Sequence, residues 1–224
     1  MTVHMKREIG NLKNKLLSLC ETVEHNLQEA VESITERDAT LAHKVIDGDV
    51  DIDRMEVEVE EECLKILALY QPVAIDLRFI ITALKINNDL ERIGDLAVNL
   101  AERSEFLAGQ GEIDIPVGLE TMTEKTQSML RKSLDALVNM DCRLAYEVCA
   151  ADDEVDAINR QIFRIVQDKI RAQPEQTESL IHLLSASRHL ERVADHATNI
   201  AEDVIYMMEG QIVRHKAEDY KSQA

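Results

Sequence analysis

A polar segment near the middle of the chain recurs, in altered form, 100 residues later: residues 89–103 read DLERIGDLAVNLAER, and residues 189–203 read HLERVADHATNIAED. A second match, offset by 103 residues, relates Asp49 and Asp53 to Asp152 and Asp156. Repetition at a nearly fixed spacing is typical of folds that combine copies of one supersecondary unit. The sequence therefore predicts two structurally similar halves.

The spacing of apolar residues predicts that both halves are helical. In the first long segment, apolar side chains recur every three or four residues, as on the buried face of a helix: Leu12, Leu16, Leu19, Val23, Leu27, Ala30, Val31 and Ile34. Strand-like alternation is nearly absent. We expect helices over residues 6–36, 39–47, 50–70, 73–107, 119–139, 141–150, 153–172 and 175–209. Gly48 is expected to end the second helix and Gly210 the last.

The predicted fold class is all-α, with two tandem, pseudo-symmetric, antiparallel three-helix bundles, each carrying one additional short helix. Residues 109–118 contain three glycines and one proline, which makes this segment the best boundary between the halves. The predicted division is residues 1–109, residues 110–213 and a charged tail over residues 214–224.

Composition argues against several classes of protein. A net charge of −18 repels the phosphates of nucleic acids, so we expect no nucleic-acid binding. The N-terminus has no apolar core of a secretion signal, and no segment reaches the roughly 18 consecutive apolar residues of a membrane span. The four cysteines show neither CxxC nor zinc-type spacing, which suits a reducing compartment. These features predict a cytoplasmic protein.

Four pairs of carboxylates stand four residues apart at equivalent places in the two halves: Asp49 with Asp53, Glu91 with Asp95, Asp152 with Asp156, and Glu191 with Asp195. Like charges at this spacing destabilise a helix by a few tenths of a kcal/mol per pair, so their recurrence needs a reason. Consecutive helices of a bundle run antiparallel, so two pairs in each half can face each other. Such a cluster suits a hard cation such as magnesium, calcium, manganese or ferric iron.

Solvated acidic faces and helix caps are the alternative interpretation. Asp47, Asp49, Asp152 and Asp153 fall near predicted helix starts, where acids accept hydrogen bonds from free N–H groups. Arg92 and Arg192 can also neutralise adjacent acids. Spacing alone leaves both interpretations open.

Three histidines, His182, His189 and His196, share one face of the last predicted helix at seven-residue spacing. Neighbours at this spacing are about 10 Å apart, so two of them cannot share an ion without help from another helix. The pattern favours a polar stripe at a helix–helix or subunit contact. A ligand or pH-switch role is the alternative.

Motifs of catalysis are missing from the sequence. It contains no GxSxG, no Gly-rich phosphate loop and no HExxH. No histidine follows a glutamate at the Glu-x-x-His spacing of di-iron bundles. We therefore predict no catalytic residues and no organic cofactor site. A metal-dependent enzyme on a helical-bundle scaffold is the alternative.

The segment QPVAIDLRFIITALKINNDLERIGDLAVNLAER, residues 71–103, resembles the PhoU family of phosphate-signalling regulators. The QPxAxDLR motif followed by a DLERIGD block carries the resemblance, and the second half supports it through LERVADHATNIAED. The resemblance extends over essentially the whole chain, to about residue 213.

The resemblance implies a cytoplasmic, non-catalytic negative regulator of the phosphate-starvation response. It implies an adaptor between the ATPase of a phosphate ABC transporter and a sensor histidine kinase, associated with the membrane only through those partners, and a homodimer. It further implies iron, zinc, manganese or magnesium bound by paired E(D)xxxD motifs. Carried over, the metal-binding residues are Asp49, Asp53, Glu91, Asp95, Asp152, Asp156, Glu191 and Asp195.

The QPxxxDLR segment has no counterpart in the second half, where residues 172–178 read AQPEQTE. Asp76 and Arg78 are therefore candidates for a partner contact specific to the first half, or they fix a helix start. Arg92 and Arg192, in the repeated signature, are further candidates for partner contacts.

Overall fold

A computed structural model describes residues 3–111 and 115–213 of the chain. The tail predicted over residues 214–224, and residues 112–114 of the predicted boundary, lie outside the described residues. Within the described ranges every regular element is helical, and there is no strand: α1 (Val3–Glu36), α2 (Ala39–Tyr70), α3 (Ala74–Ala108), α4 (Leu119–Asn139), α5 (Cys142–Ala172), the short 3₁₀ helix η1 (Pro174–Gln176) and α6 (Thr177–Glu209). The all-α prediction is confirmed.

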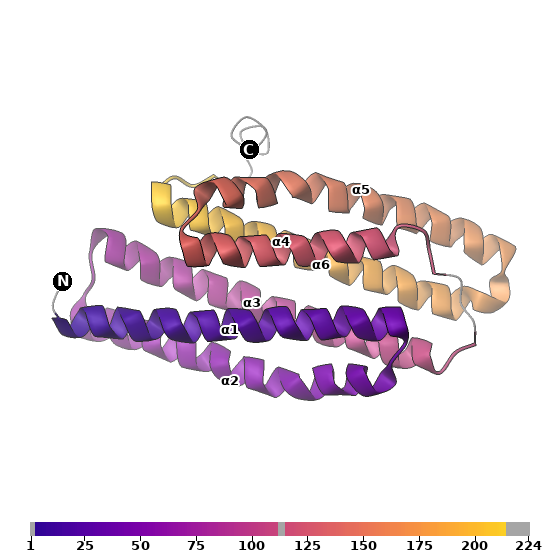
Figure 1. The fold of residues 1–224 in the computed structure, drawn as a ribbon, viewed down its shortest axis with the longest axis horizontal. Helices are drawn as coiled ribbons and strands as arrows, with labels where there is room; N and C mark the ends of the chain where they lie inside the picture. The colour runs from indigo at the N-terminus through magenta and orange to yellow at the C-terminus, as the bar shows by residue number, and fades with distance from the viewer. Residues whose placement is uncertain (1–2, 112–114, 214–224) are drawn as a thin grey trace.

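The helices form two antiparallel three-helix bundles that lie side by side (Figure 1). The first contains α1, α2 and α3, and the second contains α4, α5 and α6. Helices α3 and α6 pack against each other across the boundary, while α2 and α5 lie at opposite outer edges of the molecule (Figure 1). The two predicted pseudo-symmetric bundles are therefore present.

The turn that joins the first two helices is built the same way in both bundles. Arg37 and Met140 adopt left-handed backbone conformations, with φ of 57° and 52°. An aspartate follows each of them, and its side chain accepts hydrogen bonds from backbone N–H groups of the next helix. Asp38 caps α2 at 2.8 and 3.1 Å, and Asp141 caps α5 at 3.1 Å. Because the four residues keep the 103-residue offset, the repeat extends to the turn chemistry.

The predicted breaks inside the second helix of each bundle are wrong. Residues 39–47 and 50–70 form the single helix α2, and residues 141–150 and 153–172 form the single helix α5. Val45 and Ile52 lie on the same buried face on either side of Gly48, as Val148 and Val155 do in α5. A helical glycine costs only about 1 kcal/mol relative to alanine. Burial of the apolar residues on both sides outweighs that cost.

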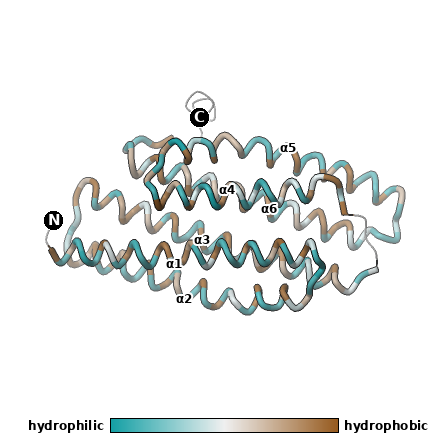
Figure 2. The backbone as a smooth tube through the Cα atoms, in the orientation of Figure 1, coloured by the Kyte–Doolittle hydropathy of each residue, from teal (hydrophilic) through white to brown (hydrophobic). Residues whose placement is uncertain are grey.

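Apolar and polar positions alternate along each helix with helical periodicity (Figure 2). Helices α3 and α6 are enclosed most, because each one packs within its own bundle and against the other bundle. Their equivalent core positions are fully buried: Leu90, Ile93, Ala97 and Leu100 in α3, and Leu190, Val193, Ala197 and Ile200 in α6. Among the described helices, none is long and apolar enough to cross a membrane.

Candidate functional site

The first acidic cluster lies where α2 faces α3. Burial raises the pKa of Asp49, and the charges of Asp53 and Asp95 raise it further. Burial also raises the pKa of Glu91, with Asp95 adding to the effect and Arg92 opposing it. Carboxylates on α2 and α3 therefore repel one another electrostatically, as the antiparallel arrangement predicted.

Arg92 only partly neutralises this cluster. Its Nη1 lies 3.1 Å from Oδ2 of Asp95, and its Nε lies 3.3 Å from Oε2 of Glu91. That Glu91 oxygen is nevertheless buried and accepts no hydrogen bond from any residue that the structure describes. A buried carboxylate oxygen without a hydrogen bond is costly, so the cluster has unused capacity to bind a cation.

Gly94 brings the two helices together at this point. A Cβ at residue 94 would lie 3.2 Å from the side chain of Ile52 and 3.4 Å from Oδ1 of Asp49. The missing side chain lets α2 approach α3 closely beside the acids. The close approach contributes to the burial that raises the pKa values of Asp49 and Glu91.

The second acidic cluster lies at the equivalent place between α5 and α6. Partial burial and the charges of Asp152, Glu191 and Asp156 raise the pKa of Asp195 to about 6. Burial raises the pKa of Asp152 as well, although Thr198 Oγ1 donates a hydrogen bond to its Oδ1 at 3.2 Å. Burial, followed by the charge of Asp156, raises the pKa of Glu191. The four predicted acids thus interact with one another in this bundle too.

The capping interpretation of these acids is wrong. Asp47 and Asp49 lie inside α2, and Asp152 and Asp153 lie inside α5, so no free N–H groups of a helix start are available to them. The caps are the aspartates of the preceding turns. Capping therefore does not explain the repeated acid pairs.

The donor chemistry of both clusters fits a cation, although the side chains do not already form a closed site. Carboxylate oxygens are the preferred ligands of hard divalent and trivalent ions. In their present conformations, no three His, Cys, Asp or Glu side chains of the described ranges are arranged to hold one ion. Binding would therefore require carboxylate side chains to rotate, and the partial exposure of Asp95 and Asp156 leaves room for such rotation.

The histidine stripe of α6 faces the other bundle. The ring of His182 stacks on Phe106 of α3, with centroids 3.7 Å apart and planes 5° from parallel. Nδ1 of His196 lies 2.8 Å from Oδ1 of Asp89, also on α3. His189 contacts Ser185 of its own helix at 3.3 Å. At His182 and His196 the stripe is therefore a helix–helix contact, as the favoured interpretation predicted.

The candidate partner-binding residues have different surroundings. Asp76 lies in the first turn of α3, where its negative charge interacts favourably with the positive end of the helix dipole. The guanidinium of Arg78 packs against Gly210 at the C-terminal end of α6, so this residue connects the two bundles. Arg92 contacts the acids described above. Arg192 is exposed, and its positive charge lowers the pKa of Glu191 against the stronger effects that raise it.

Sequence reasoning missed two polar residues of the clusters. The charge of Glu56 contributes to the raised pKa of Glu91, and Thr198 donates to Asp152. Glu56 follows Asp53 by three residues, which places it on the same line of the helix surface. Extending each acid pair by one helical turn would have found it. No comparable signal identifies Thr198.

The fold and the two clusters define a class of helical protein: paired, pseudo-symmetric three-helix bundles with an acidic cluster between the last two helices of each. The PhoU domain model matches residues 16–104 and 119–204, one match per bundle, and the chain belongs to the PhoU family.

Relatives match the chain over nearly its full length. The "Phosphate-specific transport system accessory protein PhoU homolog 1" of Thermotoga maritima is 38% identical over 209 residues, which cover 93% of this chain and 90% of that protein. A homologue from Aquifex aeolicus is 37% identical, covering 94% and 95% of the two chains. The crystal structure of PhoU from Pseudomonas aeruginosa superimposes with a TM-score of 0.89 at 36% identity, covering 92% of this chain and 99% of that one. That of the phosphate transport system regulatory protein PhoU from Streptococcus pneumoniae gives 0.83 at 26% identity, covering 93% and 99%.

Proposed function

We propose that this protein is an accessory regulator of phosphate-specific transport and acts without catalysing a reaction. The observation that carries the proposal is the near full-length similarity to proteins named as accessory proteins of the phosphate-specific transport system. We propose further that it is cytoplasmic and homodimeric, and that it restrains the phosphate-starvation response as an adaptor. Its partners in this proposal are the ATPase of the phosphate ABC transporter and a sensor histidine kinase.

The turn between α2 and α3 supports an adaptor role. Large apolar side chains here are exposed to solvent: Val73, in the turn, is 73% exposed, and Ile75, in the first turn of α3, is 71% exposed. Both belong to the QPVAIDLR segment, which has no counterpart in the second bundle. Apolar side chains that project from one turn form a surface of the kind that protein partners cover.

We propose that metal ions bind at the two acidic clusters. Asp49, Asp53, Glu91 and Asp95 would hold metal in the first bundle, and Asp152, Asp156, Glu191 and Asp195 in the second. A bound cation of iron, zinc, manganese or magnesium would neutralise like charges that face each other across two helices. The buried Glu91 oxygen that accepts no hydrogen bond supports this proposal.

Affinity capture from cells grown with and without phosphate tests the adaptor function. The wild-type protein is expected to recover a histidine kinase or the transporter ATPase. An Ile75→Ser variant tests the exposed turn, and Val138→Ser is the matched control, because Val138 is a 54% exposed apolar residue on α4. If the wild-type protein recovers neither partner under either condition, the adaptor function is wrong. If Ile75→Ser and Val138→Ser capture equally, the turn is not the contact.

A further inference from the structure

A groove of about 370 Å³ lies on the outer side of the second bundle, between α5 and α6. Its basic and aromatic lining is Arg160, Phe163, Arg164 and Arg188. Three arginines around one groove stand out in a chain whose net charge is −18. The local charge of the groove is therefore opposite to that of the protein as a whole.

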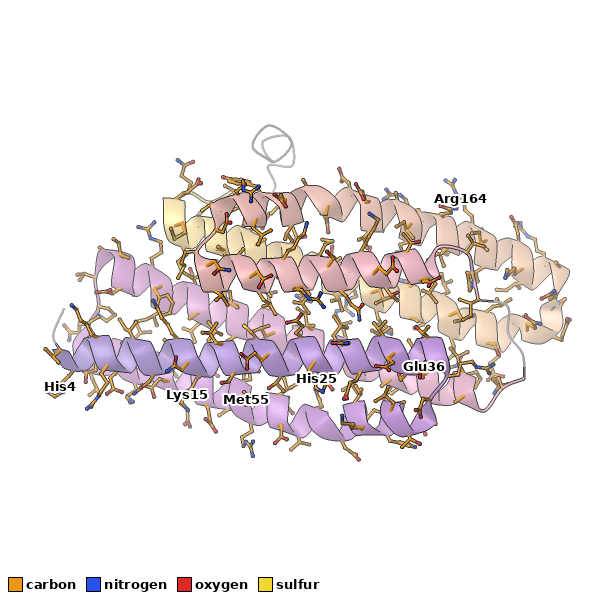
Figure 3. All side chains as sticks on the ribbon, in the orientation of Figure 1. His4, Lys15, His25, Glu36, Met55 and Arg164 are labelled. Carbon is orange, nitrogen blue, oxygen red and sulfur yellow. The ribbon has the colours of Figure 1, made fainter. Side chains whose placement is uncertain are left out.

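Two of these arginines form no hydrogen bond or ion pair with the residues that the structure describes, although the charge of Arg188 lowers the pKa of Glu191. Arg160 donates to Oδ2 of Asp156 at 3.0 Å, whereas Arg164 and Arg188 form no hydrogen bond or ion pair there. Figure 3 marks Arg164 on α5, at the outer side of the bundle. Several exposed arginines outside the groove pair with carboxylates, as Arg171 does with Asp168 at 2.9 Å. The groove thus keeps guanidinium groups available for an anion.

The repeat shows that the fold does not require this charge. Ser187 Oγ lies 3.0 Å from Oδ1 of Asn159, and at the equivalent place Asn87 Nδ2 donates to Oε1 of Glu56 at 3.1 Å. These two contacts confirm the register in which residues of α2 and α5 differ by 103, and those of α3 and α6 by 100.

In that register the basic lining of the groove disappears from the first bundle. Arg160, Phe163, Arg164 and Arg188 correspond to Val57, Glu60, Glu61 and Asn88. The same pair of helices therefore forms the same scaffold with acidic or neutral residues. Packing alone does not explain the arginines, so they point to a ligand of the second bundle.

The remaining lining determines what kind of anion fits. Phe163 is 46% exposed, which leaves ring surface available for stacking. The amide oxygen of Asn159 is occupied by Ser187, which leaves its N–H groups as donors. Leu184 adds an apolar contact, and Glu191 adds a carboxylate on the α6 side that repels phosphate. A ligand should therefore place its charged part against the arginines, away from Glu191, and an uncharged flat part against Phe163.

We propose that this groove binds an organic phosphate of the nucleotide type, with its phosphoryl groups on Arg160, Arg164 and Arg188 and its ring on Phe163. Guanidinium groups bind phosphate in a bidentate manner. The volume is that of a small-molecule site and exceeds the need of a single inorganic phosphate. The groove adjoins the second acidic cluster, because Glu191 lines it and Arg160 pairs with Asp156 of that cluster. The inference does not rest on the adaptor function.

Calorimetry on the full-length chain, with a chelator present to remove metal, tests the proposal. ATP is expected to bind, adenosine is not, and pyrophosphate is expected to bind more weakly than ATP because it lacks the ring. The double variant Arg164→Gln/Arg188→Gln should lose about tenfold or more in affinity for ATP. Phe163→Leu should weaken binding of ATP and leave binding of pyrophosphate unchanged.

The double variant Arg143→Gln/Arg171→Gln is the matched control, because it also removes two positive charges, from exposed arginines of α5 outside the groove. If this control weakens ATP binding as much as the groove variant does, the loss of affinity comes from overall charge, and the proposal is wrong. Absence of ATP binding by the wild-type protein, or full binding by the groove variant, would also overturn it. Displacement of ATP by a poly-glutamate peptide at a lower concentration than by ADP would assign the groove to an acidic protein segment instead. Circular dichroism establishes that each variant is folded.

Discussion

Replacing Asp195 by asparagine is expected to stabilise the metal-free protein at neutral pH. Burial, then the charges of Asp152, Glu191 and Asp156, raises the pKa of Asp195 from 3.8 to about 6 in the folded protein. Between these two values the folded protein binds more protons than the unfolded chain, so stability falls as pH rises. The penalty is absent below pH 3.8 and fully present above about pH 6.

The expected size of the effect follows from the shift and from exposure. A shift of this size in a wholly buried group corresponds to about 3 kcal/mol in the free energy of unfolding, because one pKa unit is worth about 1.4 kcal/mol. The side chain of Asp195 is partly exposed to solvent, so screening reduces the effect to about 1 kcal/mol. Asparagine has nearly the same shape and no charge, and it should recover this amount at pH 7 but not at pH 4.

Urea unfolding in the presence of a chelator, at about pH 4 and about pH 7, measures this difference directly. Asp135→Asn is the control, because it removes the same charge from an exposed position on α4 outside both clusters. The reasoning is refuted if Asp195→Asn changes stability equally at the two pH values, or if it destabilises the protein at pH 7. Raising the salt concentration should shrink the gain, since screening weakens repulsion between partly exposed charges.

Two further predictions concern the metal sites and the core. The double variant Asp95→Asn/Asp195→Asn should hold less iron, zinc, manganese or magnesium than the wild-type protein by elemental analysis, with Asp135→Asn as the control; unchanged stoichiometry would contradict the assignment of these acids. Leu90→Ala should destabilise the protein by about 3 kcal/mol in chemical denaturation, because Leu90 is fully buried where α3 meets its neighbours. A loss under about 1 kcal/mol would mean that the packing around Leu90 collapses into the space or is looser than described.

The sequence predicted most of the fold because its signals are local. Apolar spacing located the helices, and the offsets of 100 and 103 residues paired the two halves. The continuity of α2 through Gly48 was not predictable from local signals, because burial of Val45 and Ile52 against other helices decides it. A glycine inside a helix has a local free-energy cost, and only the tertiary structure shows which packing contacts outweigh it.

The candidate sites were predictable to a similar extent. Acid spacing found the residues that face each other between the last two helices of each bundle. The pairing of His196 with Asp89 was not predictable, because the sequence does not state which face of α3 meets α6. Both residues nevertheless interrupt the repeat in the sequence, since Leu96 and His189 occupy the equivalent positions. Differences between the halves thus mark the contact where the halves meet.

Because the two outer edges carry different charges, they are not equivalent as binding surfaces. A strictly repeated pair of bundles would present the same outer surface twice, and a binding protein would meet it equally well in either of two orientations. Instead, α2 carries Glu60 and Glu61 at one edge, while α5 carries Arg160 and Arg164 at the opposite edge (Figure 1). A charged macromolecule can therefore distinguish the two bundles and bind the protein in one orientation only.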